Sequence, residues 1–198
     1  MQAAAANSKL KIKAATAQEI GSQCPLSDDG KAELKPEMPP VAFIDALAGK
    51  GLYVDAFHFL ARALPKREAV WWACLCARAL TPDTAKPEMV AALRTAEAWV
   101  FKPNEENRRA AEKAAKATQD PHPARWSAMA AFWSGGSMAP PDGPEVKPAE
   151  DLTAKAVAAA VVLAAGLEPA QSETRNKQFI ECGLDIAAGG KGRPLAKG

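Results

Sequence analysis

The sequence predicts an all-α fold of about eight helices, stacked as αα-hairpins around a buried central helix at about Lys66–Leu80. Apolar residues make up 48% of the chain, and alanine, the strongest helix former, is the commonest of them. Runs of β-branched residues, which favour strands, are nearly absent. The sixteen prolines fall mostly between segments of helical periodicity, where they end one helix or open the next.

The length of the chain fits one domain with additional segments at each end. Its 198 residues are enough for a domain of roughly 150 residues, which needs neither disulfides nor metal to fold. We expect that domain at residues 39–188. Residues 1–38 have weak periodicity, and we expect either a flexible arm or an arm that docks on the domain or on a partner. Residues 189–198 are expected to form a basic C-terminal tail.

Eight segments repeat apolar residues at three- and four-residue spacing and are bounded by proline, glycine or a capping residue. In order, these expected helices are 41–50, 53–63, 66–80, 86–101, 105–118, 123–133, 151–165 and 172–188. The residues that mark their apolar faces are, in the same order, Ile44 and Leu47; Phe57 and Leu60; Trp72 and Cys76; Val90 and Leu93; Ala110 and Ala114; Trp126 and Met129; Val157 and Val161; Phe179 and Ile186.

The expected central helix is apolar on most of its sides, which indicates burial. Pro65 suits a helix start, and Glu68 and Arg78 lie near the helix ends that favour their charges. Because residues three and four apart share a face, Trp71 and Trp72 begin two stripes that are rotated by roughly 100°.

The expected helix at 105–118 is the most charged one. Asn104 is placed to accept a hydrogen bond from its first free N–H groups. Glu and Arg or Lys residues follow at four-residue spacing, and such pairs usually form a solvated face. After the helix at 123–133, Ser134-Gly-Gly-Ser137 predicts a helix end that leads into an irregular surface crossover up to Ala149.

The net charge and the hydropathy of the sequence bear on two questions, whether the protein binds nucleic acid and whether it inserts into a membrane. The net charge of +2 is small, whereas nucleic-acid-binding proteins usually show a concentrated basic stripe, so no nucleic-acid partner is expected. The longest apolar run, Ala156–Leu167, is too short to span a bilayer, and no apolar core of signal-peptide length occurs near the N-terminus. We therefore expect a cytoplasmic protein without membrane insertion.

The four cysteines match neither a zinc signature nor a redox Cys-x-x-Cys pair. Cys74 and Cys76 lie two residues apart on a helix, so their side chains diverge and cannot bind one metal together. We expect no cofactor and no metal. An alternative hypothesis is a metal- or redox-sensing module in which one of these two cysteines meets Cys182, Cys24 or His58 in space.

The five tryptophans are more than a small core strictly requires, and tryptophan is enriched where proteins bind each other. One or two of them lining a groove would suit a protein partner. We expect such an interaction surface at Arg67, Glu68, Trp71, Trp72, Trp133, Ser134, Gly135 and Gly136. A further hypothesis places an enzyme site at this tryptophan-rich groove and the Ser-Gly-Gly-Ser loop, although no catalytic motif is recognised in the sequence.

Two segments resemble the signatures of an uncharacterised bacterial family of unknown function. The first runs from Ala63 to Cys76 and contains the Trp71-Trp72 pair, and the second is Phe132-Trp-Ser-Gly-Gly-Ser137. The resemblance covers about Pro39 to Ala188. Genes of that family often lie near type VI secretion genes, which implies an adaptor or chaperone-like accessory role in secretion and a secretion component or effector as the partner.

The sequence thus favours a non-catalytic protein-interaction module. The helix-hairpin pattern and the lack of a recognised catalytic constellation lead to this hypothesis, and the resemblance supplies its secretion context.

Overall fold

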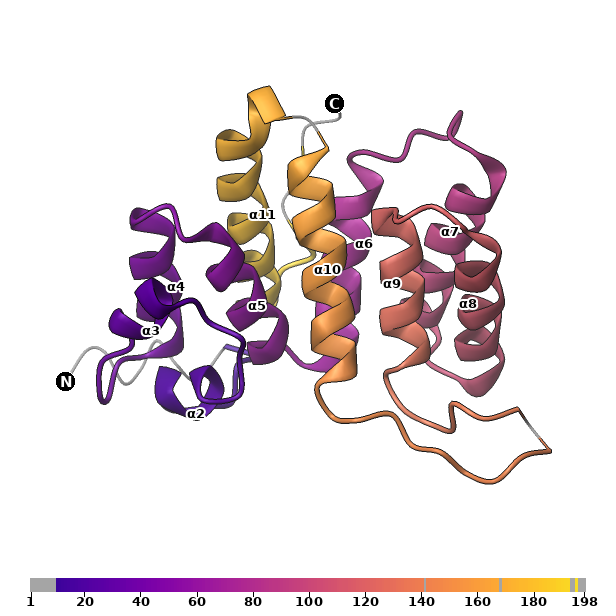
Figure 1. Cartoon of the computed structure of the whole chain (residues 1–198), viewed down its shortest axis with the longest axis horizontal. Helices are drawn as coiled ribbons and strands as arrows, with labels where there is room; N and C mark the ends of the chain where they lie inside the picture. Colours follow the sequence, from indigo (N-terminus) through magenta and orange to yellow (C-terminus); the bar gives the residue numbers. More distant parts are fainter. Residues whose placement is uncertain (1–9, 141, 168, 193–194, 196–198) are drawn as a thin grey trace.

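The structure is a computed structural model, and it describes residues 10–140, 142–167, 169–192 and 195 (Figure 1). Within these residues it is all-α, as predicted, with ten α-helices, eight of them of seven residues or more, and no strand. The helices are α2 (Ala17–Gly21), α3 (Asp28–Ala32), α4 (Pro40–Gly49), α5 (Tyr53–Ala63), α6 (Lys66–Arg78), α7 (Pro87–Phe101), α8 (Glu105–Ala117), α9 (Pro123–Phe132), α10 (Leu152–Gly166) and α11 (Ser172–Ala187), with a 3₁₀ turn η2 (Pro169–Gln171) before α11.

Two helices, rather than one, occupy the centre of the fold. α6 packs against α7, α9, α10 and α11, as expected for the central helix, but α10 likewise contacts α5, α6, α9 and α11. In Figure 1, α7, α8 and α9 lie on one side of this central pair, and α4, α5 and α11 lie on the other. α10 can occupy this position because buried alanines and valines, such as Ala156, Val157 and Ala160, let neighbouring helices approach from several sides.

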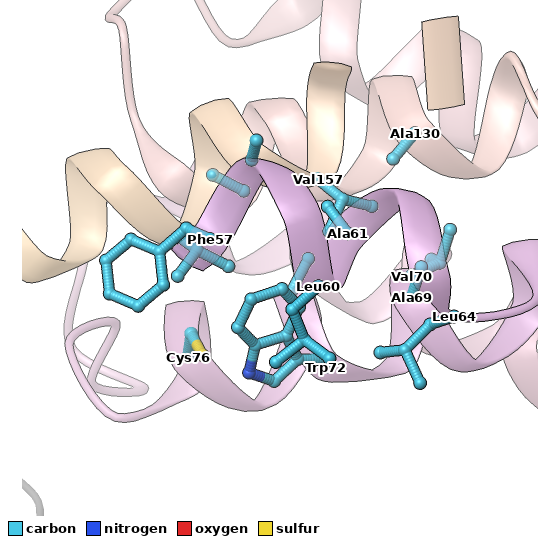
Figure 2. Close-up of a cluster of buried hydrophobic side chains, with 14 of the residues drawn as sticks. Phe57, Leu60, Ala61, Leu64, Ala69, Val70, Trp72, Cys76, Ala130 and Val157 are labelled. Atoms are coloured by element: carbon cyan, nitrogen blue, oxygen red, sulfur yellow. The ribbon is translucent and has the colours of Figure 1, made fainter. Parts of the chain in front are cut away.

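α6 is held in place by Trp72, whose side chain is fully buried. Its indole Nε1 donates a hydrogen bond of 2.8 Å to the backbone oxygen of Phe179 on α11. Figure 2 shows the same ring packed against Leu60 of α5, and its centroid lies 6.1 Å from that of Phe57 in an edge-to-face arrangement. A Cβ atom at Gly183 would lie 2.5 Å from Leu60, so α11 reaches this position only because residue 183 is glycine.

The segment before the expected domain is packed against it over the described residues 10–38. Ile12, Ile20 and Leu26 are buried. Asp55 of α5, itself only 5% exposed, accepts hydrogen bonds from the backbone N–H and the hydroxyl of Ser27. This segment therefore lies docked on the domain. The expected arm before residue 10 and most of the tail beyond residue 192 lie outside the described residues.

Arg108 of α8 corrects the expectation that the charged face of this helix is solvated. Its side chain is nearly buried, and its guanidinium donates to Glu105, to the backbone oxygen of Phe132 at 2.8 Å and to that of Ser137 at 2.9 Å. It also lies over the Phe132 ring, 4.8 Å from its centroid. Charge pattern alone misses this because the acceptors come from α9 and the following turn.

The Ser134-Gly-Gly-Ser137 turn is shaped around that guanidinium. Gly136 has a φ of +64°, in the left-handed region, and a Cβ atom there would lie 2.9 Å from the Arg108 guanidinium. Ser137 Oγ accepts hydrogen bonds from the backbone N–H groups of Ala139 and Val146, which fold the start of the crossover back on itself. The motif thus has a structural role between α8, α9 and the crossover.

Of the described helices, none is by itself both long enough and apolar enough to cross a bilayer. α10 and residues Pro169–Ala187 would meet these requirements only as a pair bent by 99°.

Replacing Gly136 with alanine is expected to lower the free energy of unfolding by about 1–3 kcal/mol, because the new Cβ atom adopts an unfavourable φ and displaces the Arg108 guanidinium. Gly135 is the matched control, since a Cβ atom there meets nothing within 4 Å. Urea unfolding monitored by circular dichroism measures both variants. Equal stability of the two would show that the turn does not depend on the approach of Arg108.

Candidate functional site

A groove lies beside the first turns of α6, where the ends of α7 and α11 and the segment around Lys11 converge. Its volume is about 500 Å³. We call it the aromatic groove. It is lined by Lys11, Arg67, Glu68, Trp71, Val100, Phe101, Ile186, Gly190 and Lys191.

Phe101 and Trp71 form the apolar wall of the aromatic groove. Phe101 is the last residue of α7, and 74% of it is exposed, more than of any other large apolar residue in the described part of the chain. The half-buried Trp71 ring lies edge-to-face to it, with 6.1 Å between the ring centroids. Lys102-Pro103 ends the helix immediately afterwards, so no later turn of α7 covers the Phe101 ring.

Arg67 fixes the end of α7 relative to the start of α6. Its Nε donates a 2.6 Å hydrogen bond to the backbone oxygen of Val100, one of the carbonyls that a helix end leaves without an internal donor. Among the described residues, no carboxylate lies within ion-pair distance of Arg67. Its guanidinium therefore holds the groove wall and keeps its positive charge at the surface.

The chain that follows α11 forms the opposite lip of the groove. Trp71 Nε1 donates a 2.8 Å hydrogen bond to the backbone oxygen of Lys191. The N–H of Gly192 donates to Asp185 at 3.0 Å. Gly192 has a φ of +89°, and a Cβ atom on it would come within 2.3 Å of Leu75. Residues 190–192 can follow α6 this closely because two of the three are glycines.

Lys11 closes the remaining side of the groove. Its backbone N–H donates to the oxygen of Ala187 at 2.7 Å, and its ammonium group lies 3.0 Å from a carboxylate oxygen of Glu68. Both side chains of this ion pair are partly exposed, so we assign it under about 1 kcal/mol of stability. Its structural effect is to connect the N-terminal segment to α6.

The expected interaction residues divide into three groups. Arg67, Glu68 and Trp71 come together in the aromatic groove. Trp72 does not line the groove. It lies one residue further along α6, so its side chain points into the core, where no partner can contact it. Trp133, Ser134, Gly135 and Gly136 follow the end of α9 and line none of the groove. The structure therefore brings three of the eight residues together in the aromatic groove, and its described lining includes no residue of the Ser-Gly-Gly-Ser turn.

Several lining residues were missed by sequence reasoning. Ile186 is expected on the apolar face of its helix, Val100 and Phe101 fall at the end of the expected helix at 86–101, and Lys11 and Lys191 fall in the terminal segments. One signal was present: Phe101 directly precedes Lys102-Pro103, so a large apolar residue occupies the last helical position, where covering neighbours are few.

No cysteine or histidine is among the described residues that line the groove. Cys74, Cys76 and Cys182 are buried free thiols, and burial raises the pKa of Cys74 and Cys76 well above the ordinary value. Burial also lowers the pKa of His58 and of His122. In the described part of the chain, no three His, Cys, Asp or Glu side chains are grouped to hold a metal ion. Thiols with raised pKa values are poor nucleophiles and poor metal ligands at neutral pH.

The groove lining supplies apolar and aromatic surface, three cations and one carboxylate. Such a surface can bind an apolar group and orient it by charge. The described lining residues include no serine, cysteine or histidine that would act as a nucleophile or a proton-transfer group near neutral pH.

Comparison with known proteins gives one family match. A family described as "Family of unknown function (DUF6931)" matches residues 43–187, from within α4 to the end of α11. The matched range contains Arg67, Trp71 and Phe101 but leaves out Lys11 and Lys191. No curated protein and no solved structure matches the chain.

The native thiols are expected to react slowly with a disulfide reagent at about pH 8. Burial raises the pKa of Cys24, which is only partly buried, from 9.0 to about 11, and this lowers its thiolate fraction about 100-fold. The three buried cysteines need local opening before they react. Stopped-flow titration in buffer and in denaturant measures this, with four rapid equivalents expected only in denaturant. Rapid reaction of two thiols in buffer would instead support the redox alternative.

Proposed function

The chain belongs to DUF6931, a family of unknown function, and we propose that it is a protein-interaction module that holds an apolar segment of a partner protein in the aromatic groove. One observation carries the proposal. Phe101 is 74% exposed and is held edge-to-face against Trp71. Aromatic and arginine side chains at a concave surface are the residue types that contribute most to protein binding.

The walls of the groove are ordered without a partner, which favours binding because little side-chain freedom is lost on association. Trp71 is held by its hydrogen bond to Lys191, and Arg67 by its bond to Val100. Trp72, buried one residue along, fixes the rotation of α6. The groove is partly open to solvent, so it can admit a side chain of a protein segment whose backbone stays outside.

The finer proposal is an adaptor or chaperone-like accessory of bacterial type VI secretion, with a secretion component or effector as the partner. It rests on the sequence resemblance and not on the family match, which carries no information about secretion. A binding groove is compatible with such a role. The Cys-based sensing alternative has less support, because burial raises the pKa values of Cys74 and Cys76 and no cysteine is among the described lining residues of the groove.

Replacing Phe101 with serine is expected to reduce partner capture at least about ten-fold, because it removes the exposed half of the aromatic pair. Tagged full-length protein is used to capture partners from lysate and, separately, purified secretion spike proteins and effectors encoded in the same genome. Bound proteins are quantified by mass spectrometry.

Val54→Ser is the matched control, since Val54 is also exposed, at 53%, but does not line the groove. The proposal requires a partner that Val54→Ser retains and Phe101→Ser loses. Partners retained equally by both variants would contradict binding at the groove. Failure of every secretion protein to bind, with another Phe101-dependent partner captured, would refute only the secretion context.

A further inference from the structure

A second hollow adjoins the aromatic groove, and the two share Lys11. It has a volume of about 570 Å³ and lies between the N-terminal segment and the corner from α5 to α6. We call it the basic hollow. Its lining includes Lys11, Lys13, Glu19, Ile20, Arg62 and Leu64. The Lys11 side chain therefore contributes to both concavities.

Positive charge is concentrated along these two concavities. Their linings together hold five cations, Lys11, Lys13, Arg62, Arg67 and Lys191, and two carboxylates, Glu19 and Glu68. The resulting charge of +3 exceeds the +2 of the whole chain, so the remainder of the sequence carries a small net negative charge. The low net charge of the whole chain therefore does not reveal that this part of the surface is basic.

Both carboxylates already have partners within the chain. Glu68 pairs with Lys11, and Glu19 accepts a hydrogen bond from the backbone N–H of Thr16 at the start of α2. The other cations make no ion pair with a described carboxylate. Arg62 donates to the side-chain oxygen of Gln23 and to the backbone oxygen of Glu150, and its charge contributes to lowering the pKa of Asp151.

Two exposed lysines of these linings are also unpaired. Among the described residues, neither Lys13 nor Lys191 has a carboxylate within ion-pair distance. Lys13 lines the basic hollow and Lys191 the aromatic groove, so each concavity contains an exposed lysine without an ion-pair partner among the described residues. Such uncompensated positive charge attracts a complementary anion and disfavours a basic one.

We infer that the partner segment is acidic: an extended stretch of protein that places an aromatic or aliphatic side chain against Trp71 and Phe101 and carboxylates beside Lys13 and Lys191. This inference rests on the proposed function and specifies its ligand. Charge complementarity selects the acidic segment, and the aromatic groove selects its apolar side chain.

A nucleic acid is the other polyanion that such cations attract, and the surface fits it less well. Outside the two concavities the rest of the sequence has a net charge of about −1, so a long phosphate backbone gains little net attraction beyond them. At the end of α7 the groove has an apolar wall, formed by Trp71 and Phe101, against which an apolar side chain of an acidic peptide can pack.

The test measures the binding of labelled peptides to the full chain by fluorescence anisotropy. The probe is a short peptide in which a central Phe is flanked by two Asp and two Glu residues. One matched peptide carries Lys at the four acidic positions, and another carries Ser in place of Phe. The acidic Phe peptide is expected to bind at least about ten-fold more tightly than either, and its affinity is expected to fall as salt is raised from about 50 to 500 mM.

Charge reversal then locates the contact. Lys13→Glu combined with Lys191→Glu is expected to weaken binding of the acidic peptide at least about ten-fold and to reduce its salt dependence. Both side chains are exposed and make no ion pair with a described residue, so the fold does not depend on them. Lys35→Glu combined with Lys113→Glu changes the net charge equally at exposed residues that line neither concavity, and is expected to leave binding unchanged.

Each outcome separates this inference from the proposed function. Equal affinity for the acidic and basic peptides, both lost in Phe101→Ser, overturns the acidic assignment and leaves the groove as the binding site. No peptide binding, with Phe101-dependent partner capture intact, also overturns it. Displacement of the acidic peptide by duplex DNA at a site sensitive to Lys13→Glu and Lys191→Glu would assign a nucleic acid instead. Loss of both peptide binding and Phe101-dependent capture defeats both proposals.

Discussion

The burial of Trp72 is the constraint on which the rest of the structure depends. The ring fills the space between α5, α6 and α11, and its single polar atom is satisfied by the backbone of Phe179. A buried indole with a satisfied N–H permits little rotation of its helix, since turning α6 would leave that donor unpaired in an apolar environment. Because adjacent helical residues point about 100° apart, fixing Trp72 inward also fixes Trp71 at the surface.

Much of the helical framework could be predicted from sequence because local residue types determine where its helices begin and end. Prolines, glycines and Asn104 start or end helices through effects that reach only a few residues along the chain. The predicted helices therefore agree with the structure to within about two residues at each end. The short helix α3 was missed. Its start is stabilised by Ser27, but Ser27 is itself held by Asp55, 28 positions further along the chain.

The site was predicted less completely because it depends on contacts between distant segments. Arg67, Glu68 and Trp71 share one helix end, and periodicity was enough to place them together. Their neighbours Phe101, Ile186 and Lys191 arrive only through tertiary packing. The Ser-Gly-Gly-Ser turn misled for the same reason, since its glycine faces Arg108 from α8 rather than a ligand. Residue type indicated which positions have an uncommon composition. Only the packing of the folded chain showed which of them stabilise the fold and which are exposed to a partner.

The bonds from Lys11 to Ala187 and from Trp71 to Lys191 have a consequence for the order of folding. They join residues separated by most of the chain, and contacts of this kind form late because a long loop must first be closed. Until α11 and the segment after it are in place, Lys11 has no acceptor at Ala187 and Trp71 has none at Lys191. The aromatic groove is therefore complete only after α11 and the segment that follows it have packed beside α6.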